Sequence, residues 1–226
     1  MPPRLPPEPV LETVLIEDGR IRLLHSHLLR LHRAGASPSQ IEAVRVLAHT
    51  WSRTTTEPTV VRFDVTPDAM VSSAARAPAS TDPVRLVTVG GYDPEDRARE
   101  QKRASRNWAI EAEAEAARRD GDEPLLVSAS GRLGETTRAS LFLIDHAGGI
   151  ATPPARGILP GVTRSWVLGG DARDDRPLHL DDLEAVRSAF ITSAGRGVVP
   201  VATIDGRPLV RDAAVDALAA DWCALV

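Results

Sequence analysis

The sequence predicts a mixed α/β (α+β) fold divided into two domains. Two observations support this prediction. Short apolar runs typical of strands alternate with helix-like segments along all 226 residues, and Gly90-Gly91, followed by Tyr-Asp-Pro, separates two such sets. We therefore expect a small N-terminal α+β domain at 1–90, a linker at 91–97, and a larger C-terminal α/β domain at 98–226.

The first domain is predicted from turn and helix signals between apolar runs. Asp18-Gly19 is a hairpin signal, Gly35 ends a helical pattern, and Ser37-Pro38 is typical of a helix start. The expected elements are a loose arm at 1–9, strands at 10–16 and 20–24, helices at 27–34 and from 38 to beyond 51, strands at 59–65 and 84–89, and turn or loop at 67–68 and 72–83.

The second domain is predicted in the same way. A run of strong helix formers closes at Gly121, and Asp205-Gly206 is a turn signal. The expected elements are a helix at 109–119, strands at 125–127, 140–145 and 150–152, helices from 163 and at 181–186, strands at 190–192 and 198–204, and a helix at 212–225.

Composition excludes several classes of protein. The formal net charge is only −4, so the chain lacks the basic footprint of nucleic-acid binding. A single cysteine, Cys223, excludes an internal disulfide framework, and no Cys/His spacing typical of a metal site occurs. We read the clustered His25, His27 and His32 as surface or packing residues rather than ligands.

No stretch predicts a membrane span or a secretion signal. No apolar run reaches the roughly 18 residues that a transmembrane helix needs. The N-terminus is rich in proline and lacks an apolar signal core. We expect a cytoplasmic protein with no membrane or nucleic-acid partner.

Lys102 is the only lysine among 27 Lys and Arg residues. Arginine can replace lysine wherever a solvated positive charge is enough, but its guanidinium stays protonated and cannot attack a carbonyl carbon. A retained amine therefore points to Schiff-base chemistry with a carbonyl substrate or with pyridoxal phosphate. The alternative is that codon usage removed lysine elsewhere and left one by chance.

The motifs around Lys102 resemble those of the class IV aminotransferase family, the fold-type IV pyridoxal phosphate enzymes. After the lysine come a helix, Asp-Glu before an apolar strand, Gly-Glu-Thr-Thr at 134–137, Ser140 before an apolar strand, Thr-Pro at 152–153, and Leu-Pro-Gly-Val-Thr-Arg at 159–164. The resemblance runs from about Leu11 to Arg207. It implies two domains with the cofactor in the cleft between them, and a homodimer.

The resemblance assigns two residues to the reactive end of the cofactor. Lys102 would be the catalytic residue, binding pyridoxal phosphate as a Schiff base and carrying protons between the substrate and the cofactor. Glu135 would pair with the pyridine nitrogen and keep it protonated, so that the ring can accept electrons. From the residues alone, Glu135 would be read as an exposed turn residue.

The resemblance also assigns residues to the phosphate and the substrate. Arg30, in a segment similar to the family's His-x-x-Arg-Leu, would hold the phosphate; the alternative is a solvated helix arginine. Val162 and Thr163 open a helix where N–H groups and a hydroxyl suit an anion. A second loop, Ser-Ala-Gly-Arg-Gly, would add the N–H groups of Ala194 and Gly195, and Arg196 would meet a substrate carboxylate.

Three departures from the family pattern bear on function. The usual segment before the Glu-Thr pair, with its aromatic substrate-pocket residue, is replaced by the proline-rich arm. Gln101 precedes the lysine where many relatives have His, and Ser140 stands where Asn is commonest. The short start and the Ser-Ala-Gly-Arg-Gly loop favour the lyase-like branch.

Three hypotheses follow for function. The first is a pyridoxal phosphate enzyme that transfers the amino group of an amino acid or acts as a lyase on aminodeoxychorismate. The second is a non-catalytic relative that keeps the fold, with or without bound cofactor. The third is a binding domain for anionic metabolites, in which Lys102 would be dispensable.

Overall fold

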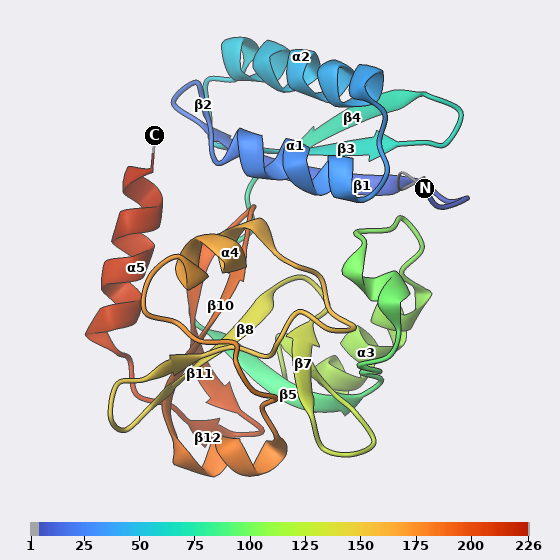
Figure 1. Ribbon diagram of the computed structural model, residues 1–226. Coiled ribbons are helices and arrows are strands. Elements are labelled where there is room, and N and C mark those ends of the chain that lie inside the picture. Colours follow the sequence, from blue (N-terminus) through green and yellow to red (C-terminus); the bar gives the residue numbers. More distant parts are fainter. Residues whose placement is uncertain (1–4, 226) are drawn as a thin grey trace.

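The computed structural model describes residues 5–225 and contains two β-sheets of different size (Figure 1). Residues 1–4 of the arm predicted at 1–9 lie outside the described part of the chain. The first sheet has the strand order β2-β1-β3-β4. Its elements are β1 (Val10–Glu17), β2 (Arg20–Ile21), β3 (Thr59–Val65) and β4 (Val71–Arg76), with the helices α1 (Leu24–Arg33) and α2 (Pro38–Thr54).

One face of the first sheet is covered by α1 and α2 (Figure 1). Alternate residues of β1 and β3, such as Val14 and Phe63, point into this core and are fully buried. The start of α2 is fixed by a capping box, in which Ser37 and Gln40 exchange side-chain and backbone hydrogen bonds. The helix predicted to begin at Ser37-Pro38 is confirmed.

Strand β4 corrects the sequence-based prediction of turn or loop at 72–83. It pairs with β3 in an antiparallel register from Val65↔Val71 to Val60↔Arg76. It was missed because it is an edge strand made mostly of small and polar residues that stay exposed, so it carries no apolar alternation. The returning strand predicted at 20–24 is also shorter, because Leu23 is left-handed (φ 51°) and α1 begins at Leu24.

The second sheet has the order β7-β6-β5-β11-β10-β8-β9, with β12 paired to β11. Its strands are β5 (Val84–Gly90), β6 (Glu123–Val127), β7 (Leu133–Thr136), β8 (Ser140–Asp145), β9 (Ile150–Ala151), β10 (Val186–Ser193), β11 (Gly197–Ile204) and β12 (Arg207–Pro208).

Strand β5 corrects a second expectation. The domain predicted at 1–90 included it, but β5 runs parallel to both β6 and β11 and so belongs to the second sheet. The Gly-Gly pair that suggested a boundary at 90–91 ends this strand, whereas the chain crosses between the sheets before Val84.

The remaining helical segments follow β5 in the chain. They are η1 (Arg97–Glu100), α3 (Asn107–Arg118), α4 (Val162–Leu168), η2 (Leu180–Ala185) and α5 (Ala213–Ala224). Of these, α3, α4 and α5 pack on the second sheet, with α3 on β5 and β6 and α5 on β11. In Figure 1, α5 extends from the second sheet towards the first, where Arg22 donates hydrogen bonds to the carbonyls of Trp222 and Cys223.

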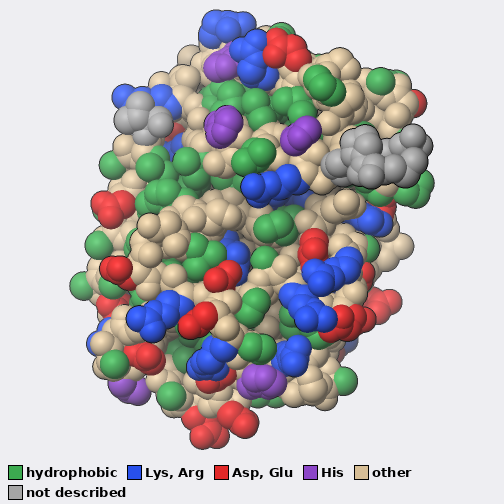
Figure 2. Space-filling model, in the orientation of Figure 1, with side chains coloured by type: hydrophobic (Ala, Val, Ile, Leu, Met, Phe, Trp, Pro, Cys, Tyr) green, Lys and Arg blue, Asp and Glu red, His purple; other side chains and the backbone are tan. Residues whose placement is uncertain are grey.

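Two features are absent from the described residues: a helix that could span a membrane, and a cluster of side chains that could bind a metal ion. Within residues 5–225, no helix is long and apolar enough to cross a membrane. Over the same range, no group of three or more His, Cys, Asp and Glu side chains is placed to hold a metal ion. Figure 2 shows positive and negative side chains mixed over one face of the molecule, in agreement with its small net charge.

Candidate active site

A cavity of about 760 Å³ lies between the uncovered face of the first sheet and the second sheet. Strands β1, β3 and β4 line one side of it through Thr13, Arg62 and Arg76. All the site residues predicted from the sequence line this one cavity: Arg30, Lys102, Glu135, Val162, Thr163, Ala194, Gly195 and Arg196.

Lys102 is held at the cavity by strand β1. Its backbone carbonyl accepts a 2.6 Å hydrogen bond from the Leu11 N–H, and its Nζ donates to the Thr13 Oγ1 at 2.9 Å. Burial lowers the pKa of the Lys102 amine to about 8, and the Arg30 charge adds to this effect. About a tenth of an amine with this pKa is unprotonated at pH 7, far more than for an ordinary lysine, and the unprotonated form is the one that a nucleophile requires.

Arg30 is fixed by a buried carboxylate. Its Nε and Nη2 donate to the two oxygens of Glu12, at 3.0 and 2.5 Å, and its Nη1 reaches the Pro160 carbonyl at 3.4 Å. Burial would raise the pKa of the Glu12 carboxyl, but the charge of Arg30 and the hydrogen bonds from Arg30 and His27 hold it well below its usual range. Arg30 is therefore a positioned cation rather than a solvated helix residue.

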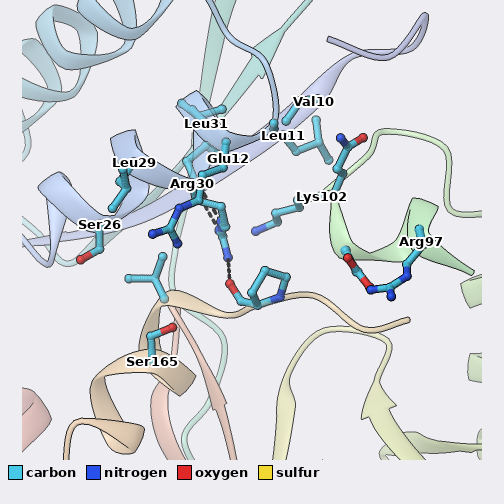
Figure 3. Close-up of a pocket in the computed structure, with 16 residues that line it drawn as sticks. Val10, Leu11, Glu12, Ser26, Leu29, Arg30, Leu31, Arg97, Lys102 and Ser165 are labelled. Atoms are coloured by element: carbon cyan, nitrogen blue, oxygen red, sulfur yellow. Dashed lines mark hydrogen bonds and ion pairs between the residues drawn. The ribbon is translucent and has the colours of Figure 1, made fainter. Parts of the chain in front are cut away.

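Figure 3 shows this arrangement at a smaller neighbouring cavity of about 540 Å³. Arg30 comes from α1 and Glu12 from β1, and the Lys102 side chain points towards them from the opposite wall. The His27 Nδ1 lies 2.9 Å from Glu12 Oε1, and burial lowers the pKa of His27, so the imidazole is neutral at pH 7. The prediction that His27 is a packing residue agrees with its burial.

Glu135, on β7, is a carboxyl group without a cationic hydrogen-bond partner among the described residues. One of its oxygens accepts a 3.0 Å hydrogen bond from the Leu159 N–H. Burial raises the pKa of Glu135 to about 8. Because ionisation is unfavourable there without a counter-charge, the position favours a ligand that brings a positive charge or that accepts the proton of this carboxyl group.

Two threonine hydroxyls on the cavity wall are buried without a partner. The Oγ1 atoms of Thr163 and Thr192 make no hydrogen bond within residues 5–225. Buried hydroxyls are normally hydrogen-bonded, so unpaired ones at a cavity suggest a polar ligand. The backbone beside them leaves little room for a side chain, because a Cβ on Gly161 would lie 3.0 Å from the Ser140 hydroxyl.

The second predicted loop lies between β10 and β11. Ala194 and Gly195 are partly buried in its turn, and a Cβ on Gly195 would lie 3.2 Å from Val60 of the first sheet. Arg196 forms an ion pair with Glu123, whose other oxygen accepts a hydrogen bond from Thr136 at 2.7 Å. The guanidinium predicted to meet a substrate is thus already paired with a protein carboxylate.

Sequence reasoning missed Glu12, Thr13 and His27. Glu12 has a detectable signal, since it falls on the buried face of a strand whose alternate residues are otherwise apolar. His27 lies one helical turn before Arg30, so both can reach the same carboxylate. Thr13 gives no comparable signal, because the residue that it contacts, Lys102, is 89 positions away in the sequence.

Sequence comparison identifies the family. The profile of the family described as amino-transferase class IV matches residues 9–204. A Methanocaldococcus jannaschii protein, provisionally named a branched-chain-amino-acid aminotransferase, is 36% identical over 92 residues. That match covers 38% of this chain and 32% of the relative, so it spans about a third of the relative's length.

Solved structures show the same fold. The pyridoxal phosphate-bound form of a hypothetical aminotransferase from Mycobacterium tuberculosis has a TM-score of 0.81 and 23% identity, over 99% of this chain and 93% of that one. A structure from Legionella pneumophila, provisionally named 4-amino-4-deoxychorismate lyase, has a TM-score of 0.82 and 19% identity, over 96% and 97% of the two chains. These similarities confirm the predicted α/β (α+β) architecture. Together with the profile match, they show that this chain belongs to the class IV aminotransferase family.

Proposed function

We propose that this protein is a pyridoxal phosphate-dependent enzyme that acts on the amino group of a small substrate. One observation supports the proposal above the others. The only lysine of the chain, with a pKa lowered to about 8, shares a cavity with a fixed arginine, a carboxyl group whose pKa is raised to about 8, and two threonine hydroxyls that have no hydrogen-bond partner within residues 5–225.

The polar groups of the cavity fit the parts of pyridoxal phosphate. Arg30, the Thr163 hydroxyl and the backbone N–H groups of Val162, Ala194 and Gly195 would hold the phosphate. Glu135 would give its proton to the pyridine nitrogen, and the resulting pyridinium would be the cationic partner that this carboxylate lacks among the described residues. When bound, the cofactor supplies an electron sink for the carbon next to the substrate's amino group.

Lys102 would carry the protons of the reaction. Its Nζ can take a proton from the substrate's α-carbon because its lowered pKa leaves part of it unprotonated. The Thr13 hydroxyl, 2.9 Å away, accepts a hydrogen bond from this amine and so keeps it aimed into the cavity. Arg196 remains our candidate for a substrate carboxylate, provided that it can leave or share Glu123.

Transamination and lyase chemistry both begin with this proton transfer, so the same residues serve either reaction. The Methanocaldococcus jannaschii relative is named for transamination and the Legionella pneumophila structure for lyase activity. We propose an amino acid or aminodeoxychorismate as the substrate, and a homodimer as the family resemblance implies. Light scattering on the purified protein tests the dimer, and the expected cytoplasmic location stays a prediction.

Turnover by purified protein supplied with pyridoxal phosphate tests the proposal. We expect activity with at least one amino donor or with aminodeoxychorismate, and its loss in Lys102→Ala. The matched control is Arg103→Ala, which removes the neighbouring cation. A protein that binds the cofactor yet converts nothing in a broad panel would instead support the non-catalytic relative. Activity that survives in Lys102→Ala would refute the role of the lysine.

A further inference from the structure

The cavity wall carries many more positive than negative side chains. Its basic residues are Arg30, Arg62, Arg76, Arg99, Lys102, Arg103, Arg106, Arg138 and Arg196, and its acidic residues are Glu8, Asp96, Glu123 and Glu135. The phosphate and the α-carboxylate of a substrate account for part of this excess. The rest has to be explained by another anion or by ion pairs within the protein.

Most of these guanidinium groups have a carboxylate partner. Arg30 pairs with Glu12, Arg196 with Glu123, and Arg138 with Glu113 at 2.9 Å. Arg103 lies 3.3 Å from Glu8. Their charges are therefore balanced within the protein.

Arg106 and Arg76 differ from them, since neither forms a salt bridge among the described residues; Arg76 is exposed on β4, whereas Arg106 is half-buried. Among the same residues, the only hydrogen bond of Arg106 goes to the carbonyl of Thr137. Its guanidinium lies beside the Trp108 ring, with its centre 5.8 Å from the ring centroid. Burial lowers the pKa of Arg106, which expresses the cost of keeping this charge away from water.

Arg62 brings a second guanidinium to the same region. It stands opposite Thr13 in the register of β1 and β3, so both side chains project from the cavity face of the first sheet. Its partner Asp64 lies two residues along the same strand, in an exposed pair. The charges of Arg106 and Arg62 both lower the pKa of Lys102, so both lie within electrostatic reach of the reactive amine.

We propose that Arg106, supported by Arg62, binds a second carboxylate of the substrate, distinct from the α-carboxylate. This inference rests on the proposed function and narrows it to amino compounds with two carboxylates. A branched apolar side chain would bury Arg106 further without a counter-charge, and an uncompensated buried charge is strongly unfavourable. An acidic amino acid meets this requirement with its side-chain carboxylate. Aminodeoxychorismate meets it with one of its two carboxylates, neither of which is on the carbon that bears the amino group.

Binding of glutarate and pentanoate to the protein tests the inference without turnover. The two probes have the same chain length, but only glutarate has a second carboxylate. We expect glutarate to bind at least about tenfold more tightly, as measured by calorimetry, because a hydrogen bond to a charged group typically contributes that much or more. Arg106→Gln should abolish the preference, and Arg106→Lys should retain part of it.

Arg103→Gln is the matched control, since it removes a cavity guanidinium that already has a carboxylate partner. It should leave the preference for glutarate unchanged. Equal losses in Arg106→Gln and Arg103→Gln would overturn the inference, because they would indicate a general effect of charge. Equal affinity of the unaltered protein for glutarate and pentanoate would overturn it as well.

Turnover then distinguishes this inference from the proposed function. With a 2-oxo acid present to accept the amino group of an amino acid, we expect kcat/KM for glutamate to exceed that for leucine by at least tenfold, with the ratio falling in Arg106→Gln. The same preference over leucine is expected if aminodeoxychorismate is the substrate, which needs no amino acceptor. Formation of 2-oxoglutarate would identify glutamate as the substrate, and formation of an aromatic product would identify aminodeoxychorismate. If kcat/KM for leucine equals kcat/KM for glutamate and for aminodeoxychorismate, the inference is wrong. If that turnover of leucine also requires Lys102, the proposed function is still supported. Failure to bind pyridoxal phosphate would overturn the proposed function, whereas glutarate binding would still test Arg106.

Discussion

At the scale of single residues, two neighbours on β1 hold two cations of the site. Glu12 accepts two hydrogen bonds from Arg30, and Thr13 accepts one from Lys102. The two side chains project from opposite faces of the strand, yet both cations reach the same cavity. This pair therefore sets the position of both the proposed phosphate ligand and the proposed nucleophile.

Replacing Glu12 tests the first of these contacts. Glu12→Gln leaves Arg30 partly buried without its counter-charge, so the free energy of unfolding should fall by about 3 kcal/mol. Urea denaturation of the cofactor-free protein measures this loss. Glu42→Gln, which removes an exposed pair with Arg45, is the control and should cause no measurable change. Equal stability of the two variants would contradict the structural role of Glu12.

Glu135 predicts a pH dependence of stability. Its pKa is about 8 in the folded protein and 4.5 as the ordinary value, so the folded state binds more protons between these limits. The contribution of Glu135 to the free energy of unfolding is therefore lost as the pH rises from about 4.5 to 8. Relative to Glu135→Gln, the cofactor-free protein should lose on the order of 4 kcal/mol between pH 5 and pH 8.5. Parallel stability curves for the two proteins, measured by urea unfolding, would rule out the raised pKa.

The sequence predicted the members of the site better than the contacts among them. Lys102, Glu135 and Thr163 could be found because motifs mark them, and they share the cavity; their roles stay predictions. Arg106 and Thr13 carry no local signal, since their importance depends on which distant segments surround them. The ion pair between Arg196 and Glu123 could likewise not be predicted from the sequence, because the two residues are 73 positions apart.

At the scale of elements, turn and capping signals predicted more than apolar alternation did. The capping box at Ser37 and Gln40 fixes the start of α2, and the Asp18-Gly19 turn joins β1 to β2. Strand β4 was missed because an exposed edge strand needs no apolar face, and its pairing depends on β3 rather than on its own residues. Strand β5 was recognised, but its sheet was not, because parallel pairing leaves no mark in a single strand.

The capping box gives a prediction for α2. Ser37→Ala removes the side-chain acceptor of the Gln40 N–H and should lower the free energy of unfolding by about 1 kcal/mol. Thermal or urea unfolding measures the change. Ser72→Ala, on the exposed edge strand β4, alters a serine that caps no helix and should have a smaller effect. A larger loss in Ser72→Ala would show that the cap does not define this helix.

At the scale of the whole molecule, the cavity depends on how the two sheets are held together. Helix α5 packs on the second sheet, and its last carbonyls accept hydrogen bonds from Arg22, which follows the first sheet. Arg22 is buried and also pairs with Glu17. This contact links the end of the chain to the part that carries Arg30.

Arg22→Ala should weaken that link. The carbonyl of Trp222 would keep only the 3.3 Å hydrogen bond from the Leu225 N–H, and the carbonyl of Cys223 would also lose Arg22, so the free energy of unfolding should fall by about 2 kcal/mol. Hydrogen exchange should become faster in the last turn of α5. The control is Arg20→Ala, an exposed neighbour that should change neither quantity. Unchanged exchange in α5 after Arg22→Ala would mean that packing alone holds the helix.

The most direct test of the central claim is to identify the residue that carries the cofactor. Purified protein with added pyridoxal phosphate should show a visible absorption band that bleaches with borohydride, and peptide mass mapping should find the reduced cofactor on Lys102. No band at saturating cofactor, or a cofactor fixed at any other position, would contradict the proposal that Lys102 makes this protein an enzyme.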